Sequence, residues 1–212
     1  MTGLALSPVD IDVSRETLDR LGIYHALLME WNPRINLVSK STIPAAWTRH
    51  ILDSAQVFTL CPEVRHREHW LDIGSGGGFP GMVCAILAKE ALPDLRFTLI
   101  ESDKRKSVFL RTVAQRTGIS VRICADRSEN VPPQDADILS ARALAPLNDL
   151  LYHVERHVAA GGMALLPKGV RYPQEITVAR KCWHFDLKMH PSVIDAQAII
   201  LEMRGVRRVG RN

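Results

Sequence analysis

The apolar positions in the first 60 residues recur at helical spacing. In the stretch 14–32 they fall on one side of a helix, at Leu18, Leu21, Leu28 and Trp31. Ser14 precedes this stretch and is a candidate N-cap. A second stretch, 41–60, has the same spacing, and neither stretch alternates as a strand would. We therefore predict a helical segment at the start of the chain, without a clear strand.

After this segment, short apolar runs alternate with amphipathic stretches. The runs predict strands at 69–74, 96–102, 119–125, 136–143 and 162–169. The stretches between them predict helices at 80–91, 103–117, 146–158 and 173–183. Two more apolar runs, 184–190 and 196–204, predict an antiparallel edge. This order indicates an α/β, Rossmann-like fold: a mostly parallel seven-stranded sheet with helices on both faces.

The same pattern divides the chain into three parts. Residues 1–66 are the predicted helical extension, packed on the core, and residues 67–206 are the predicted α/β core. Residues 207–212 form a basic tail that is a candidate for disorder. A length of 212 residues fits one domain with a small extension.

Composition narrows the class of protein. No apolar run reaches the roughly 18 residues of a membrane span, and no secretory signal is visible, so we expect a cytoplasmic protein. The four cysteines form no CxxC pair and the histidines no HExxH motif, so we expect neither disulfides nor a metal. The net charge of +4 is weak evidence for an anionic partner by itself, but the basic residues are clustered along the chain. Residues 103–116 carry five basic side chains and residues 204–212 carry four arginines, a pattern that suits a phosphate backbone as well as a solvated face.

The stretch "WLDIGSGGGFPG" (70–81) places five glycines in eight positions directly after the first strand of the core. Two cofactors compete for this turn. Residues 76–81 match GxGxxG, the dinucleotide fingerprint, with Glu101 about 20 residues onward. The series Asp72, Gly74, Gly76 and Gly78 matches the first-strand motif of S-adenosylmethionine methyltransferases. Asp72 favours the second interpretation, because its carboxylate would repel a pyrophosphate and attract an ammonium or sulfonium group.

Glu101, at the end of the second strand, can accept both ribose hydroxyls of either cofactor. The end of the fourth strand reads "SARALAPLND", which lacks the [DNS]PP[YFW] motif of enzymes that methylate exocyclic amines. No cysteine is placed for attack on a pyrimidine ring. A ring nitrogen such as guanine N7 carries a free lone pair and needs no general base, so its methylation is catalysis by positioning.

Six motifs occur in an order that matches a known family. They are "WNPRINLVS" (31–39), "RHILDS" (49–54), "LDIGSGGGFPG" (71–81), "LIESDKRKSVFL" (99–110), "SARALAPLNDL" (140–150) and "LPKG" (166–169). From about residue 14 to 203 the chain resembles the bacterial 16S ribosomal RNA guanine-N7 methyltransferase G family (RsmG, also called GidB). The resemblance implies a class I S-adenosylmethionine-dependent methyltransferase that modifies one guanine in the decoding-region loop of 16S ribosomal RNA. Its partner would be that RNA or the small ribosomal subunit.

The resemblance also implies site residues. Cofactor contacts fall on Gly74, Phe79, Ser128, Glu129 and Arg142, with Ser128 and Glu129 framing the adenine. Candidates for guanine or phosphate contact are Arg127, Arg142, Lys168 and the helix at 103–116.

Plainer interpretations stay open at several positions. Arg142 could be a surface arginine that caps a helix. Arg49 and Asp53 could pair at i, i+4 to stabilise their helix, and a structural role is favoured for His50. The alternatives for the whole protein are a nicotinamide-dependent oxidoreductase and an RNA-binding protein without activity. Nothing in the sequence demands more than a monomer.

Overall fold

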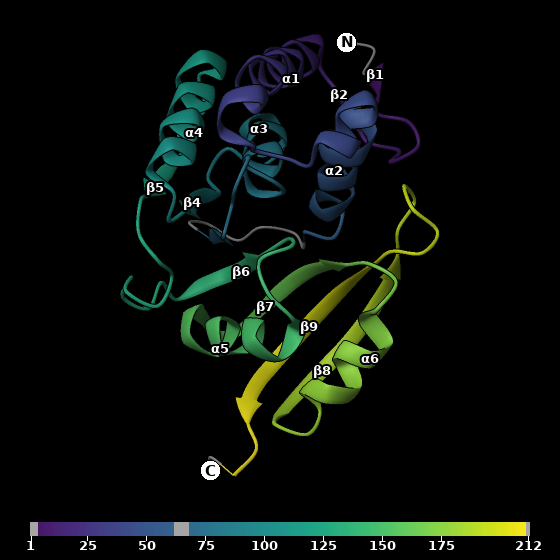
Figure 1. The fold of residues 1–212 in the computed structure, drawn as a ribbon, viewed down its shortest axis with the longest axis vertical. Helices are drawn as coiled ribbons and strands as arrows, with labels where there is room; N and C mark the ends of the chain where they lie inside the picture. Colours follow the sequence, from purple (N-terminus) through teal and green to yellow (C-terminus); the bar gives the residue numbers. More distant parts are fainter. Residues whose placement is uncertain (1–3, 62–67, 211–212) are drawn as a thin grey trace.

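A computed structural model describes residues 4–61 and 68–210 of the chain. Its centre is a seven-stranded sheet with the order β5-β4-β3-β6-β7-β9-β8 (Figure 1). The strands are β3 (His69–Ile73), β4 (Arg96–Ile100), β5 (Arg122–Cys124), β6 (Ala136–Ser140), β7 (Val158–Lys168), β8 (Trp183–Pro191) and β9 (Ile199–Arg208). The first five are parallel, and β9 is antiparallel to both of its neighbours. This confirms the predicted fold class.

Helices cover both faces of the sheet (Figure 1). On one face lie α1 (Arg15–Ile35), α2 (Asp53–Phe58), α3 (Gly81–Ala91) and α4 (Lys104–Thr117); on the other lie α5 (Leu147–His157) and α6 (Tyr172–Ala179). Two predicted boundaries follow from local chemistry. The Ser14 hydroxyl accepts from the Thr17 amide at 3.2 Å and caps α1, and Gly118 ends α4 with a φ of 65°.

The N-terminal extension differs from its prediction in two ways. It contains a short antiparallel pair, β1 (Leu4–Ala5) and β2 (Asp12–Val13), so the expectation of no strand was wrong. Two residues per strand are too few to show an alternating pattern. The predicted helix 41–60 is three pieces: a 3-10 helix (Lys40–Ala45), a π-helix (Trp47–Leu52) and α2. The predicted boundary at 66/67 lies outside the described residues.

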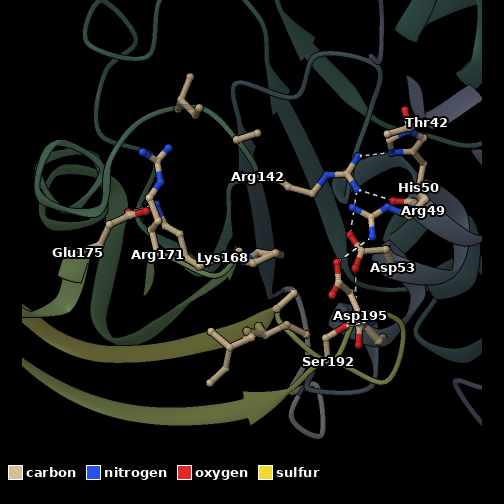
Figure 2. Close-up of a pocket in the computed structure, with 18 of the residues that line it drawn as sticks. Thr42, Arg49, His50, Asp53, Arg142, Lys168, Arg171, Glu175, Ser192 and Asp195 are labelled. Atoms are coloured by element: carbon tan, nitrogen blue, oxygen red, sulfur yellow. Dashed lines mark hydrogen bonds and ion pairs between the residues drawn. The ribbon is translucent and has the colours of Figure 1, made fainter. Parts of the chain in front are cut away.

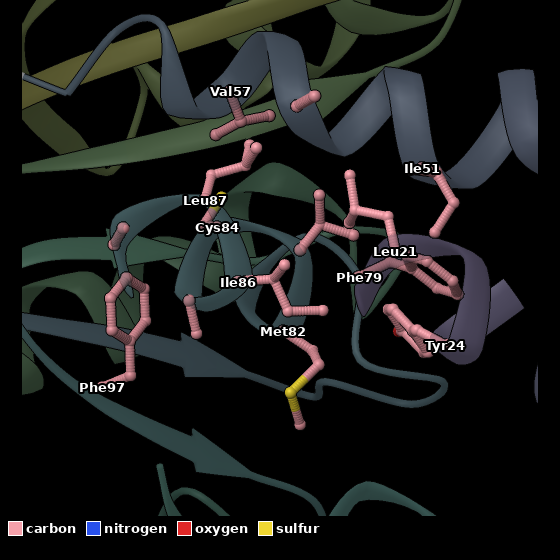
Figure 3. Packing of buried hydrophobic residues seen from close by; sticks show 14 of the residues in the cluster. Leu21, Tyr24, Ile51, Val57, Phe79, Met82, Cys84, Ile86, Leu87 and Phe97 are labelled. Atoms are coloured by element: carbon pink, nitrogen blue, oxygen red, sulfur yellow. The ribbon is translucent and has the colours of Figure 1, made fainter. Parts of the chain in front are cut away.

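The extension packs on the core through aromatic and aliphatic side chains. Tyr24 of α1 is fully buried and stacks on Phe79 of the glycine turn, with ring centroids 5.3 Å apart. Figure 3 shows this contact beside Leu21, Ile51 and Met82, which come from α1, the π-helix and α3. Burying such side chains provides most of the stability of this interface. The extension is therefore continuous with the core and shares one hydrophobic cluster with it.

The C-terminal strand runs further than predicted. Arg207 and Arg208, assigned to a disordered tail from the sequence, belong to β9 and pair with His184 and Trp183 of β8. Arg211 and Asn212 lie outside the described residues. Within residues 4–61 and 68–210, no helix is long and apolar enough to cross a membrane.

Candidate functional site

The glycine turn leaves the carboxyl end of β3 and borders a cavity of about 510 Å³. Gly74 and Gly76 have φ angles of 61° and 55°, which L side chains rarely adopt, and both line the cavity. Phe79 and Glu101 line it too. A cavity of this size at the carboxyl ends of parallel strands is where α/β proteins bind their ligands. Arg142 lines the same cavity, so the structure brings five of the predicted cofactor residues to one place.

Gly78 has a packing role that the sequence did not predict. Its φ is 96°, and a Cβ built on it would lie 2.5 Å from the Tyr24 hydroxyl and 2.9 Å from Cβ of Met82. It does not line the cavity. Gly78 therefore lets α1 pack closely on the turn, and its predicted part in admitting the cofactor stays a prediction.

Asp72 lies beneath the turn and is fully buried. Its Oδ1 accepts from the Ser140 hydroxyl at 2.5 Å, and a Cβ on Gly81 would come within 2.5 Å of Cβ of Asp72. Burial raises the pKa of Asp72 to about 6, although its hydrogen bonds and the charge of Arg142 act in the opposite direction. Asp72 does not border the cavity. Its attraction for the cofactor therefore remains a prediction, and the buried carboxylate would act through its electric field without direct contact.

Glu101 follows β4 and is 7% exposed, with both carboxylate oxygens engaged. Oε2 accepts from the Gly76 amide and Oε1 from the Asp103 amide, each at 2.7 Å. Each oxygen keeps a further lone pair for a hydroxyl. Glu101 therefore orders the glycine turn, and its contact with ribose stays a prediction that this placement permits.

A second cavity of about 490 Å³ adjoins the first. The two share five residues of their walls: Thr42, His50, Arg142, Ala143 and Leu144. Arg142, just after β6, therefore lies between the two cavities. Figure 2 shows its guanidinium turned toward His50 and Asp53 of the extension, with Lys168 and Glu175 across the cavity.

Arg142 is anchored by several acceptors. Its Nη1 donates to Oδ2 of Asp53 at 3.0 Å and to the carbonyl of Arg49 at 3.1 Å, and its Nη2 lies 3.0 Å from Nδ1 of His50. The guanidinium carbon lies 5.0 Å from the centroid of the Phe79 ring. These bonds use three of the five N–H groups of an arginine, which leaves two for a bound molecule. Arg142 therefore lies at the walls of both cavities and is not a surface arginine that caps a helix.

The suggested Arg49–Asp53 pair does not form. Asp53 bonds Arg142, while Arg49 pairs with Asp195 of the β8–β9 loop at 2.8 Å. The π-helix between Trp47 and Leu52 changes which side chains share a face, so spacing rules for an α-helix do not apply there. Such π segments are rare and frequently occur at functional sites.

Lys168 lies at the end of β7 and forms part of the opposite wall. Its ammonium contacts Glu175 at 2.8 Å and the Ala145 carbonyl at 3.1 Å, and the side chain is 10% exposed. The ion pair holds the lysine at the wall of the second cavity, beside Arg171. Lys168 and Arg142 therefore line one cavity, and their contact with guanine or phosphate stays a prediction.

Ser128, Glu129 and Arg127 lie apart from both cavities. The Ser128 hydroxyl lies 3.1 Å from Nδ1 of His153, and Glu129 lines another cavity, of about 790 Å³, along α5. Arg127 is exposed and lines none of these three cavities. The adenine contacts of Ser128 and Glu129 and the RNA contact of Arg127 stay predictions.

Several residues of the second cavity had no predicted role, among them Thr42, Glu175 and Asp195. Each comes from a different element, so no local spacing connects them. Only the "RHILDS" motif gave a signal nearby, through His50 and Asp53. Among residues 4–61 and 68–210, no group of His, Cys, Asp or Glu could hold a metal ion.

A seven-stranded sheet of this order, with the glycine turn after β3 and an acid after β4, defines a class I S-adenosylmethionine-dependent methyltransferase. Solved structures share the fold. A mutant of MtNAS in complex with S-adenosylmethionine matches with a TM-score of 0.58 and 14% identity, over 89% of this chain and 75% of that one. A predicted O-methyltransferase, Atu636 from Agrobacterium tumefaciens, matches with a TM-score of 0.56 and 17% identity, over 75% and 82%.

Sequence similarity identifies the family. The model of the family GidB, rRNA small subunit methyltransferase G, matches residues 17–200. Ribosomal RNA small subunit methyltransferase G of Ruegeria sp. (strain TM1040) is 51% identical over 95% of this chain and 97% of its own. The protein of the same name from Bartonella tribocorum is 44% identical over 92% and 91%. The chain belongs to the GidB family, which confirms the resemblance, the methyltransferase class and the cofactor, and excludes the nicotinamide alternative.

Proposed function

We propose that this protein transfers the methyl group of S-adenosylmethionine to N7 of one guanine in the decoding-region loop of 16S ribosomal RNA. Family membership supports the reaction and the RNA. The observation that carries the assignment of the site is Arg142, which borders both adjoining cavities. We assign the cavity at the glycine turn to the methyl donor and the second cavity to the guanine.

The residues of the first cavity fit the donor. S-adenosylmethionine supplies an electrophilic methyl group on a sulfonium, and its ribose offers two hydroxyls. Glu101 presents a carboxylate with free lone pairs, and Gly76 leaves the wall open, since a Cβ there would meet only the Gly74 carbonyl, at 3.8 Å. Asp72 adds a buried negative charge beneath the turn. The Leu144 side chain packs directly on Gly74 and forms an apolar wall.

The second cavity suits a base that needs positioning rather than a proton acceptor. Guanine N7 carries an in-plane lone pair, so the enzyme has only to align it with the methyl group and exclude water. Arg142 can donate to O6, next to N7, with the N–H groups that the protein leaves free. Lys168 is held by Glu175 at the opposite wall. Both residues are proposed guanine or phosphate contacts.

The flanking RNA would meet exposed basic side chains. α4 exposes Lys104, Arg105, Arg111 and Arg116, and Arg127 is exposed after β5. Phosphate contacts with such residues contribute affinity without sequence information. We propose a monomer that acts in the cytoplasm on the small subunit or its RNA.

One experiment tests this assignment. Small subunits that lack the modification are incubated with labelled S-adenosylmethionine, and N7-methylguanine is mapped by borohydride reduction and aniline cleavage. A single cleavage in the decoding-region loop is expected. Label on another atom or on many guanines would refute the N7 assignment, and RNA binding without any transfer would favour the inactive alternative. Arg142→Gln should reduce transfer, while Lys188→Gln, at an exposed site on β8, is the matched control.

A further inference from the structure

Arg142 is held by a chain of hydrogen bonds whose direction is fixed from end to end. The Thr42 hydroxyl donates to the Ser39 carbonyl at 2.7 Å, so its oxygen is left to accept from Nε2 of His50, 2.8 Å away. On the other side of the ring, Nδ1 lies 3.0 Å from Nη2 of Arg142, a nitrogen that can only donate. His50 must therefore accept at Nδ1 and carry its proton at Nε2.

We propose that His50 is a positioning residue for methyl transfer. Its neutral Nε2–H tautomer, selected by Thr42, accepts from Arg142 and aims the guanidinium between the two cavities. This inference rests on the proposed function, because it takes Arg142 to contact the reacting molecules. His50 itself acts through Arg142.

The anchoring geometry gives His50 a role that the other acceptors do not share. Asp53 and the Arg49 carbonyl both bind Nη1, whereas His50 is the partner of Nη2 among the described residues. Two bonds at one nitrogen hold the group in place but leave it free to turn. The third bond, at the other nitrogen, fixes the plane of the guanidinium, and with it the direction of the N–H groups that face the cavities.

The surroundings of His50 keep the ring neutral. The residue is 7% exposed, and its ring centroid lies 5.1 Å from that of Phe79. Burial, and then the charges of Arg142 and Arg49, lower the pKa of His50 to about 4, while Asp53, whose carboxylate bonds Arg142, is the nearby negative charge. A proton on Nδ1 would point at the donor of Arg142 and break the bond. The surroundings of His50 thus favour a neutral ring, which accepts a hydrogen bond at Nδ1, over a protonated ring.

Two substitutions separate the two sides of the ring. Asparagine places an amide oxygen near the position of Nδ1 and can still accept from Arg142; glutamine places an amide nitrogen near Nε2 and can still donate to Thr42. We expect His50→Asn to keep kcat within about 3-fold, and His50→Gln to lower kcat about 10–100-fold, as is typical when the group that orients a contacting residue is lost. Both variants should melt at the same temperature and keep the KM for S-adenosylmethionine within about 2-fold, a change worth less than one tenfold step in binding.

The tautomer gives a readout that does not depend on folding of a variant. In the wild-type protein, nitrogen NMR of the labelled imidazole should show Nε2–H from pH 8 down to about pH 5, since the ring is protonated only near its lowered pKa. Thr42→Val should mix the two tautomers and lower kcat. An Nδ1–H tautomer in the wild-type protein, or equal losses of kcat in the asparagine and glutamine variants, would overturn the inference. Methyl transfer to a different atom would refute the proposed function and leave this comparison intact, since it uses total transfer.

Discussion

Replacing Gly78 by alanine should destabilise the protein more than the same change at Gly76, two residues earlier in the turn. Two costs add. A φ of 96° is strained for an L residue by roughly 1–2 kcal/mol or more. The new Cβ would also lie 2.5 Å from the Tyr24 hydroxyl, 2.9 Å from Met82 and 3.0 Å from Leu110, and overpacking of this kind costs about 1–3 kcal/mol. The sum is about 2–5 kcal/mol, which corresponds to roughly 4–20 °C in a domain of this size.

Three matched substitutions divide this cost into its parts. Gly118→Ala adds a Cβ to open space at a φ of 65°, so it should show only the backbone strain, about 1–2 kcal/mol. Gly22→Ala lies inside α1 with nothing within 4 Å, so it should stabilise the protein by about 1 kcal/mol. Gly76→Ala has a φ of 55° and a nearest atom at 3.8 Å, so its stability should match that of Gly118→Ala.

Urea unfolding gives the free energies, and calorimetry with S-adenosylmethionine gives the affinities. Gly76→Ala should lose affinity for S-adenosylmethionine at least tenfold, because Gly76 lines the cavity, whereas Gly78→Ala should bind the donor normally at temperatures where it stays folded. Equal unfolding energies for Gly78→Ala and Gly118→Ala would refute the packing argument. Normal binding by Gly76→Ala would refute the placement of the donor.

Three further predictions follow from the charged groups. Glu101→Ala should weaken binding of S-adenosylmethionine about 10–100-fold by calorimetry, since a hydrogen bond to a charged group is worth about 1.5–3 kcal/mol, and an unchanged Kd would contradict the ribose contact. Binding of RNA should weaken as the salt concentration rises. Replacing Arg111 and Arg116 by glutamine should reduce the slope of log K against log salt by about 1–2, whereas the control Lys181→Gln should leave the slope unchanged. A flat salt response would exclude α4 as the docking surface. The pKa of Asp72 in the folded protein is about 6, above its ordinary value of 3.8, because burial favours the protonated carboxyl. The free energy of unfolding of the protein should therefore fall by about 3 kcal/mol as the pH rises from about 4 to 6. Asp72→Asn should flatten this part of the curve of unfolding free energy against pH, and an identical curve for both proteins would rule out the raised pKa.

The sequence predicted the parts of the fold that depend on local chemistry. A serine before an amphipathic run and a glycine after one have direct consequences for backbone hydrogen bonds, and both ends of their helices appear where expected, at Ser14 and Gly118. The alternation of apolar runs and helices was likewise enough to give the parallel sheet. The observed end of a strand differs from the predicted one where pairing with a neighbouring strand determines it. β9 continues to Arg208 because β8 offers it partners as far as Trp183, although its side chains are basic.

The site was predicted only as far as single segments allow. Glu101 and the glycine turn lie on neighbouring strands, and topology alone brings them together. The contact of His50 with Arg142 joins residues 92 positions apart, and the contact of Asp53 with Arg142 spans 89 positions. Helical spacing suggested that Asp53 pairs with Arg49, a weak interaction on a helix surface. In the folded chain the half-buried Arg142 guanidinium competes for the same carboxylate, and a partly buried pair with two further acceptors is the stronger one.

The second cavity closes only when three distant parts of the chain meet. Gln56 of the extension donates to the Ser192 hydroxyl and accepts from the Val193 amide, each at 3.0 Å, so the β8–β9 loop is tied to α2. The same Gln56 donates to Asp53 at 2.8 Å, on the carboxylate that holds Arg142. The direction of the guanidinium after β6 therefore depends on both ends of the chain. Because catalysis by positioning tolerates little misplacement, we expect the proposed reaction to depend on the extension and the C-terminal hairpin as much as on the strands that carry Glu101 and Arg142.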